Sequence, residues 1–324
     1  MRCSVRFSRM KIGLHETLTG ALLSKVTGNA GRIRVPRGFY SPGFWTAFAC
    51  RALQQHVPAD VIDFEGSDNE SYSKAMRLQE ILGGTDDYDH IRLRDGQTYS
   101  SLEHLNCAEA TDGATSRIKK CIRGLFDGTG AEQFVDGVGN IVAELHDNVW
   151  SHGRASGVSM AQRWEQTSEF EFALADHGLG FLRELRRVGL GAGLDDSGAI
   201  RWCIQQGNTT SPGANEWAQK LPGDAIGNPF QGIENTTDSD VHHAGLGLWK
   251  FVELVRLFRG TAWIASGSAC LLISPGREAI LPIRPWGGVA MSCRFNEAGI
   301  KAAPTQAEDP AVLAILQILR EPAR

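Results

Sequence analysis

Three polar residues spaced four apart, Glu144, Asn148 and His152, are the strongest candidates for chemistry in this sequence. Successive residues of an α-helix turn by about 100°, so positions four apart line up along one edge. Where such an edge borders the core, a carboxylate or an amide is costly unless something bonds it. Gly153 follows directly, and the pattern therefore predicts the wall of a ligand cavity. The alternative interpretation is a helix edge that is capped by neighbouring loops.

The helix that would carry these residues is predicted over Phe134–His152. Its apolar residues fall on one side of a helical wheel and predict a core-facing stripe, formed by Phe134, Val138, Ile141, Val142, Leu145 and Val149. The opposite side is expected to face water, with Glu132, Asp136, Asn140, His146, Asp147 and Ser151. The three candidates overlap the margin of the stripe.

Two glycine turns could form the other walls of the cavity. The first ends a strand within Glu169–Phe181 and contains Asp176, Gly178 and Gly180. The second opens directly into an amphipathic helix and contains Gly245, Leu246, Gly247 and Leu248. Glycine lets the backbone approach a phosphate, and a helix N-terminus points its N–H groups at the anion. No Gly-x-x-x-x-Gly-Lys-Ser/Thr loop occurs, which excludes a Walker-type ATPase.

Glu-x-x-x-Asn-x-x-x-His, Asp-x-Gly-x-Gly and Gly-Leu-Gly-Leu, in this order, resemble the motifs of the GHKL ATPases. That family includes gyrase-type topoisomerases, mismatch-repair ATPases, heat-shock chaperones, histidine kinases and anti-sigma-factor serine kinases. The resemblance covers roughly Ala114–Asn296, and three ordered motifs are far more specific than one. It implies an α+β fold, a two-layer sandwich of a mixed, mostly antiparallel sheet with helices on one face (the Bergerat type). It also implies ATP and Mg²⁺ as ligands.

The resemblance also implies roles for single residues. Asp176 would accept the adenine amino proton, while Gly178 and Gly180 let the base lie against the backbone. Asn148 would coordinate Mg²⁺, and Glu144 would be the general base. His152 would either help to hold the phosphates or interact with the helix dipole, and both readings stay open. The turn Gly245–Leu248 would bind the phosphates.

The sequence departs from the family pattern in two places. The first glycine expected in the second turn is His243. The chain has Gly287-Gly288 near its C-terminal strand, where the family often has Gly-Thr, so a threonine contact near adenine is not carried over. Neither change removes a charge-bearing group.

The chain divides into two predicted units. Residues 1–100 are predicted as a small α/β domain, with strands at Arg32–Pro36 and Ala59–Phe64 and helices at Ser41–Val57 and Ser71–Leu82. Its pattern is similar to the STAS-like domains fused to some GHKL proteins. Residues 101–113 are predicted as a linker, and residues 114–324 as the ATP-binding domain.

Within the second unit, further elements follow from periodicity and turn residues. They are a hairpin at Ser156–Trp164 and Glu169–Ala175, a helix at Ser197–Gln206, a strand pair at Gly260–Ala265 and Ala269–Ser274, a strand at Val289–Phe295 and a helix at Pro310–Leu319. Residues 191–241 have little apolar density and lie between the two glycine turns, where the family carries its ATP lid.

The composition limits the class of protein and its cellular compartment. The 324 residues are 42% hydrophobic and 22% charged, which is typical of a globular protein. A formal net charge of −4 predicts no general attraction for nucleic acid or for anionic membranes. Seven scattered cysteines without a Cys-x-x-Cys pair argue against zinc or disulfides and predict a reducing, cytoplasmic setting. No apolar run is long enough for a membrane span, and no signal peptide is predicted.

Three classes of function remain. The leading interpretation is an ATP–Mg²⁺-binding signalling ATPase or protein kinase, of the histidine or serine/threonine type, whose lid closes on nucleotide. The second is a non-catalytic module in which ATP gates an interaction with a protein partner. The third, a globular domain without a ligand, must explain Glu144, Asn148 and Asp176 as structural groups. A homodimer is compatible with each class.

Overall fold

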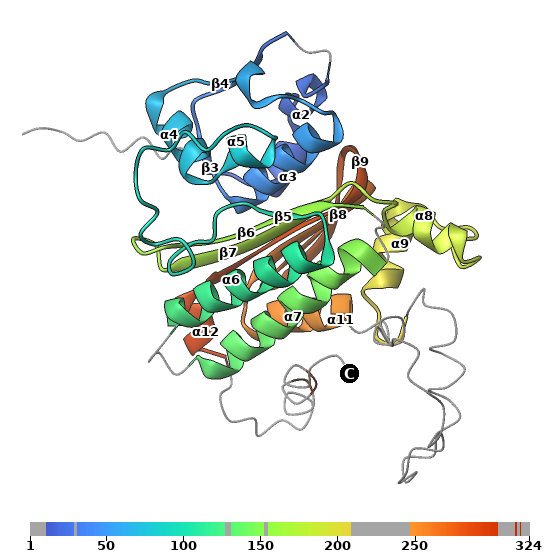
Figure 1. The fold of residues 1–324 in the computed structure, drawn as a ribbon. Helices are drawn as coiled ribbons and strands as arrows, with labels where there is room; N and C mark the ends of the chain where they lie inside the picture. Colours follow the sequence, from blue (N-terminus) through green and yellow to red (C-terminus); the bar gives the residue numbers. More distant parts are fainter. Residues whose placement is uncertain are drawn as a thin grey trace, which may run out of the picture.

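A five-stranded antiparallel sheet forms the centre of the computed structural model, which describes residues 11–28, 31–126, 131–151, 155–208 and 247–303 together with Ile315 and Ile318 (Figure 1). The strand order is β5-β6-β7-β9-β8. The strands are β5 (Glu103–Leu105), β6 (Gly157–Trp164), β7 (Glu169–Asp176), β8 (Thr261–Ser274) and β9 (Arg277–Asn296). This sheet with its packed helices confirms the α+β class.

The middle of the sheet follows the predicted hairpin. β6 and β7 pair along their whole length, from Gly157 opposite Asp176 to Trp164 opposite Glu169. Phe170, Phe172 and Leu174 point to one face and belong to the same core cluster. The period-2 pattern of this strand therefore placed its large apolar side chains correctly.

The predicted strand pair at Gly260–Ala265 and Ala269–Ser274 is wrong. Both segments belong to the single strand β8, which pairs with the long strand β9. The register shifts at Ser266/Gly267 and again before Ala269, so the Ser-Gly-Ser sequence forms an irregularity inside a strand and not a turn. The predicted strand Val289–Phe295 is the C-terminal part of β9.

Three helices cover one face of the sheet: α6 (Ala108–Phe126), α7 (Glu132–Ser151) and α11 (Gly247–Leu257). The predicted helix Phe134–His152 is confirmed as α7, and its whole apolar stripe is buried. His146 was expected to face water, but it is fully buried because α6 packs against that flank of α7. The water-facing side of the wheel is therefore narrower than predicted.

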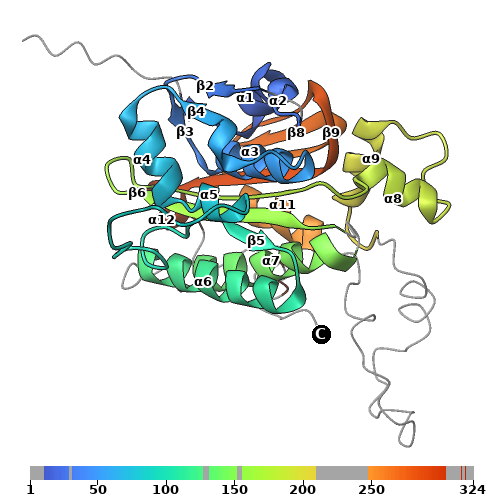
Figure 2. The same ribbon diagram turned by 45° about the horizontal axis from the view of Figure 1, so that its top comes forward.

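The opposite face is covered by the N-terminal part of the chain (Figure 2). Helices α1 (Leu14–Thr19) and α3 (Pro42–Gln54) pack on β6, β7, β8 and β9, and their buried residues join one core cluster with sheet residues such as Met160 and Ala290. The prediction of helices on one face only is therefore wrong. Residues 11–64 act as a second covering layer and share the core of the sheet.

Glu171 of β7 joins the two layers. This fully buried carboxylate accepts hydrogen bonds from Ser41 Oγ (2.7 Å) and Gly43 N (3.1 Å) at the start of α3. Its second oxygen accepts two hydrogen bonds from the guanidinium of Arg294 on β9, at 3.0 and 2.8 Å. A buried charge is tolerated when it is paired and hydrogen-bonded in this way.

The N-terminal layer contains the expected parallel pairing. β2 (Ile33–Val35) pairs with β4 (Ile62–Phe64), and β1 (Lys11–Ile12) pairs with β3 (Phe39–Tyr40). The short elements around them are α2 (Leu22–Lys25), a 3-10 turn (Ala59–Val61), α4 (Ser67–Ala75) and α5 (Leu78–Ile81). The predicted helix Ser71–Leu82 is therefore two helices, separated at Arg77, which has φ +62°. The residues predicted as a linker, 101–113, instead contain β5 and the start of α6.

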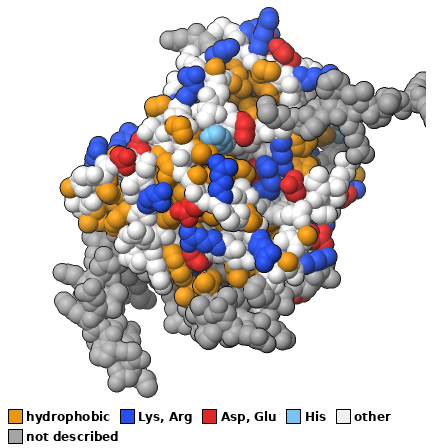
Figure 3. All heavy atoms as spheres, turned by 180° about the vertical axis from the view of Figure 1, so that it is seen from behind, with side chains coloured by type: hydrophobic (Ala, Val, Ile, Leu, Met, Phe, Trp, Pro, Cys, Tyr) orange, Lys and Arg blue, Asp and Glu red, His pale blue; other side chains and the backbone are white. Residues whose placement is uncertain are grey.

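Helices α8 (Phe181–Arg187) and α9 (Asp196–Cys203) extend from one end of the sheet, and α12 (Glu297–Lys301) follows β9. Among the described residues, no helix combines the length and the apolar character that a membrane crossing needs. On the face seen in Figure 3, basic, acidic and hydrophobic side chains of the described residues lie intermixed.

Candidate functional site

Three elements carry the predicted site residues to the same end of the sheet. α7 brings Glu144 and Asn148, the end of β7 brings Asp176, and α11 begins at Gly247. A Cβ placed on Gly157, which pairs with Asp176, would lie 3.2 Å from Val149 of α7 and 3.4 Å from the Cβ of Asp176. The helix and the strand end are thus in direct contact, and Asn148 precedes the contacting residue.

Glu144 is buried and forms an ion pair with Lys250 of α11. The Nζ of Lys250 donates to Oε1 of Glu144 at 2.6 Å, and both residues are only 5% exposed. Replacing one partner of such a pair leaves a buried charge without compensation. The predicted general base is therefore also a link between α7 and the first turns of α11.

Gly247 lies against the two polar residues of α7. A Cβ built on it would lie 3.0 Å from Oε2 of Glu144 and 3.5 Å from Nδ2 of Asn148. Asn148 is half-buried, and its amide makes no hydrogen bond with the described residues. The structure thus brings together three of the predicted positions, and the glycine at the start of α11 permits their close approach.

Asp176 is 4% exposed and its two carboxylate oxygens differ. Oδ1 accepts the backbone N–H groups of Gly178 (2.8 Å) and Val289 (3.3 Å). Oδ2 has no hydrogen-bond partner among the described residues. Burial raises the pKa of this carboxyl to about 6, and the two backbone hydrogen bonds oppose that rise. Oδ2 is not among the fully enclosed unpaired side-chain atoms of the described residues, so it keeps an opening through which a ligand could donate a hydrogen bond to it.

The backbone around Asp176 is tightly packed. Gly288 of β9 has no room for a side chain, because a Cβ there would lie 2.3 Å from the carbonyl oxygen of Asp176. Gly180 has φ +72°, and a Cβ on it would lie 2.7 Å from Ser266 Oγ. Ser266 donates to the carbonyl of Gly288 (3.0 Å) and accepts from the N–H of Phe181 (3.1 Å). Glycine is therefore required at both positions.

Some predicted site residues cannot be placed. His152, Gly245 and Leu246 lie outside the described residues, as do residues 209–241 of the predicted lid. The described part of that lid, residues 191–208, contains α9, which confirms the helix predicted at Ser197–Gln206 to within a few residues. Leu248 packs against the hydrophobic core. The helix predicted at Pro310–Leu319 is described only at Ile315 and Ile318.

Four residues of this region were missed in the sequence: Lys250, Ser266, Trp286 and Gly288. Lys250 is the fourth residue of the amphipathic helix α11, and a lysine in such a helix is normally expected to face solvent. Ser266 and Trp286 belong to strands and act through long-range contacts that no local pattern reveals. Only Gly288 could be noticed in the sequence, because Gly287-Gly288 stands where the family often has Gly-Thr.

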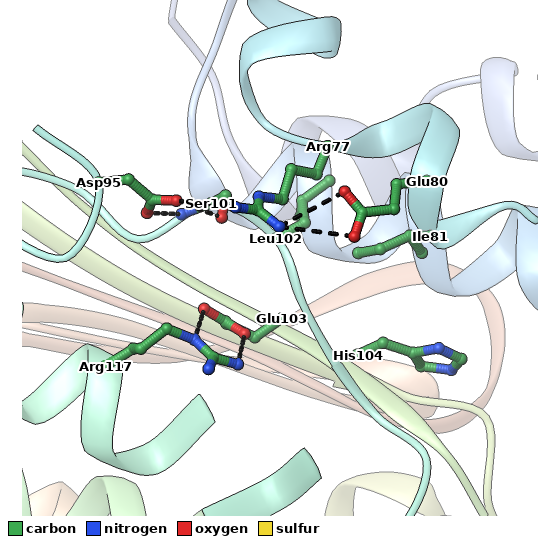
Figure 4. A pocket seen from close by; sticks show the side chains of 9 residues that line it. All are labelled: Arg77, Glu80, Ile81, Asp95, Ser101, Leu102, Glu103, His104 and Arg117. Carbon is green, nitrogen blue, oxygen red and sulfur yellow. Dashed lines mark hydrogen bonds and ion pairs between the residues drawn. The ribbon is translucent and has the colours of Figure 1, made fainter. Parts of the chain in front are cut away.

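A separate pocket of about 350 Å³ lies between the α4–α5 junction and β5 with α6 (Figure 4). It is lined by Arg77, Glu80, Ile81, Asp95, Ser101, Leu102, Glu103, His104 and Arg117. The two arginines are already paired, Arg77 with Glu80 (3.4 Å) and Arg117 with both oxygens of Glu103. None of the predicted site residues lines this pocket.

Metal binding in the site would depend on few protein ligands. The described residues contain no group of three or more His, Cys, Asp or Glu side chains that could hold a metal ion. The half-buried amide of Asn148 offers an oxygen of the kind that Mg²⁺ accepts. Mg²⁺ commonly takes one or two protein ligands and completes its shell with phosphate and water oxygens, so this donor set fits a nucleotide-bound Mg²⁺.

The chain matches no protein-family model, no curated protein and no solved structure.

Proposed function

We propose that this protein binds ATP with Mg²⁺ between α7, the start of α11 and the end of β7, in the manner of the GHKL family with its Bergerat-type fold. The observation that carries the proposal is the carboxylate of Asp176. It is buried, one oxygen is fixed by two backbone N–H groups, and the other has no partner among the described residues. Such an oxygen suits the exocyclic amino group of adenine, which donates a hydrogen bond.

The neighbouring backbone supports a base at this position. Gly288 and Gly180 let the main chain pack closely around Asp176, which holds its carboxylate in a fixed orientation for a donor group. A guanine base presents a carbonyl oxygen where adenine presents its amino group. Two acceptors facing each other in a buried site are unfavourable, so the proposal includes a preference for ATP over GTP.

The other end of the site would take the phosphates. Asn148 supplies the ligand to Mg²⁺, and the ion would neutralise phosphate charge and orient the phosphates. Glu144, one helical turn earlier, would act as the general base. These assignments describe a signalling ATPase or a protein kinase of the histidine or serine/threonine type.

A second candidate function is a non-catalytic module whose interaction with a protein partner is gated by ATP. The ion pair between Glu144 and Lys250 favours it, because that carboxylate is already engaged by an ammonium group at 2.6 Å. In this candidate ATP binds tightly and changes the exposed surface without rapid hydrolysis.

Calorimetric titration with ATP, with and without Mg²⁺, tests the shared part of the two candidates. We expect saturable 1:1 binding that Mg²⁺ strengthens, and we expect Asn148→Ala to lose the Mg²⁺-dependent part. The matched control is Asn140→Ala, two turns earlier on α7. A phosphate-release assay then separates the candidates, since wild-type turnover near background identifies the module. No ATP binding in a folded protein would refute both.

A further inference from the structure

The ion pair between Lys250 and Glu144 sits in the middle of the proposed nucleotide site. Lys250 lies on the first turns of α11, and its Nζ is 2.6 Å from Oε1 of Glu144. The side chains of the two residues are only 6% and 7% exposed. Burying two charges costs solvation that their attraction repays only with good geometry, so this contact is a specific feature of the site.

The second oxygen of Glu144 is not bonded by Lys250. Oε2 lies near Gly247, where an added Cβ would be 3.0 Å away, and it accepts no hydrogen bond from the described residues. A general base must bring an oxygen within hydrogen-bond reach of the proton that it takes. The ion pair holds the side chain of Glu144 on α11 and so limits the orientations in which Oε2 can reach an attacking water.

We propose that Lys250 is a positioning residue that holds Glu144 in this engaged state and so keeps hydrolysis of bound ATP slow. The inference rests on the proposed function, since it concerns the same site. It makes the protein a module that retains its nucleotide, with a base that is present but held in place by its ion pair. Lys250 acts here through Glu144, while binding of the base depends on Asp176 at the other end of the site.

The reaction that Lys250 would restrain is hydrolysis of the terminal phosphoanhydride bond. The water oxygen forms a bond to the γ-phosphorus, and the bond from that phosphorus to the β,γ-bridging oxygen breaks. ADP leaves with the electron pair of the broken bond. The carboxylate of Glu144 takes the proton of the attacking water through Oε2, the oxygen that Lys250 does not bind.

The test compares four forms of the full chain: wild type, Lys250→Met, Glu144→Gln and the double variant. Methionine keeps the length of the lysine side chain but has no charge. We expect Lys250→Met to bind ATP within a few fold of wild type and to release phosphate at least about tenfold faster, because a positioned base contributes about 10²–10⁴ in rate. The double variant should return to background, since the gain requires the carboxylate.

Controls separate an effect on turnover from an effect on folding. Lys301→Met removes another helical lysine that is paired with a glutamate, Glu297, but is exposed, and it should change nothing. If Lys250→Met does not fold, Lys250→Leu is used instead, because leucine is apolar and donates nothing to Glu144. A thermal melt of each variant, and of the double variant in which neither charge remains, shows which proteins are folded.

Turnover that is unchanged or lower in a folded Lys250 variant with intact ATP binding would overturn the inference. A gain in turnover that persists in the double variant would also overturn it, because Glu144 would then not be the group released. Failure of the proposed function gives a different result. In that case wild type and every variant would show no heat of ATP binding at all.

Discussion

Trp286 of β9 donates its indole N–H to the backbone carbonyl of Asp176, at 3.1 Å. The guanidinium of Arg51 on α3 lies over the same indole ring, 5.1 Å from its centre. The thiol of Cys50 is 3.7 Å from Nδ1 of His177, the residue after Asp176. The N-terminal layer therefore contacts the back of the loop that presents the Asp176 carboxylate.

This relationship predicts the effect of Trp286→Phe. Phenylalanine keeps an aromatic ring against Arg51 but removes the N–H that fixes the carbonyl of Asp176. We expect ATP affinity to fall by about 0.5–1.5 kcal/mol, the usual worth of one hydrogen bond, in a protein that still folds. The measurement is calorimetry, with Trp263→Phe on β8 as the matched control, because Trp263 stacks with Arg294 on the same sheet. Equal losses in the two variants would argue against a specific role for Trp286.

The raised pKa of Asp176 predicts that Asp176→Asn stabilises the folded protein at neutral pH, although the same change should weaken ATP binding. Its pKa is about 6 in the folded protein and 3.8 as an ordinary value, so ionisation disfavours the folded state. This penalty is absent below about pH 4, grows as pH rises to 6 and amounts to about 3 kcal/mol at pH 7, at 1.36 kcal/mol per pKa unit. Asp176→Asn should therefore raise Tm at pH 7 and have little effect at pH 4. A lower Tm at pH 7 in this variant would contradict the assignment.

His146 predicts acid sensitivity of the fold. It is fully buried between α6 and α7, its Nδ1 is 2.7 Å from Thr115 Oγ1, and its Nε2 has no partner among the described residues. Burial lowers the pKa of this imidazole to about 3, from an ordinary 6.5. Its neutral form is favoured by folding, so stability should fall as pH drops from about 6.5 towards 3.

The corresponding experiment follows Tm against pH in wild type and in His146→Leu. Leucine removes the titrating group, so the decline in Tm over this pH range should become shallower. The exposed residue His90 provides the matched control as His90→Leu. Identical pH profiles in wild type and His146→Leu would show that the buried imidazole is not responsible.

Glu171 predicts how firmly the N-terminal layer is attached. Glu171→Ala removes the acceptor of Ser41, Gly43 and Arg294 from a fully buried position, and loss of one partner of a buried pair costs about 3–5 kcal/mol. Denaturant unfolding should show this loss in one cooperative transition for the whole chain. Glu169→Ala, two residues earlier, removes more exposed contacts with Lys11 and Thr167 and should cost far less. Two separate transitions in wild type would contradict a shared core.

The elements most accessible to sequence reasoning were those with strong local patterns. The stripe from Phe134 to Val149 placed α7, and the alternation at Phe170, Phe172 and Leu174 placed β7. The wheel failed at His146 because it shows which residues share a face but not how many neighbours the helix has. α6 packs beside α7 and buries a flank that one-sided amphipathicity assigns to water.

The sequence of α3 does indicate that this helix is covered on both sides. Ten of the thirteen residues of α3 are buried, and a helix that is apolar all round lies between layers. Long-range strand pairing explains why a turn was wrongly expected at Ser266–Ser268. The hydrogen bonding of β8 to β9 overrides the local turn preference of these residues. The Lys250–Glu144 contact joins residues 106 positions apart, so no local pattern could reveal it.

The most direct measurement is the ATP dissociation constant of Asp176→Asn, by calorimetry near pH 7.5 with Mg²⁺ present. The matched control is Asp136→Asn, which makes the same change at an exposed position of α7. The account predicts a loss of about 1.5–3 kcal/mol, roughly 10- to 150-fold, for Asp176→Asn, because a hydrogen bond to a charged group is lost. It predicts no change for the control. An unchanged dissociation constant in Asp176→Asn would contradict the adenine site.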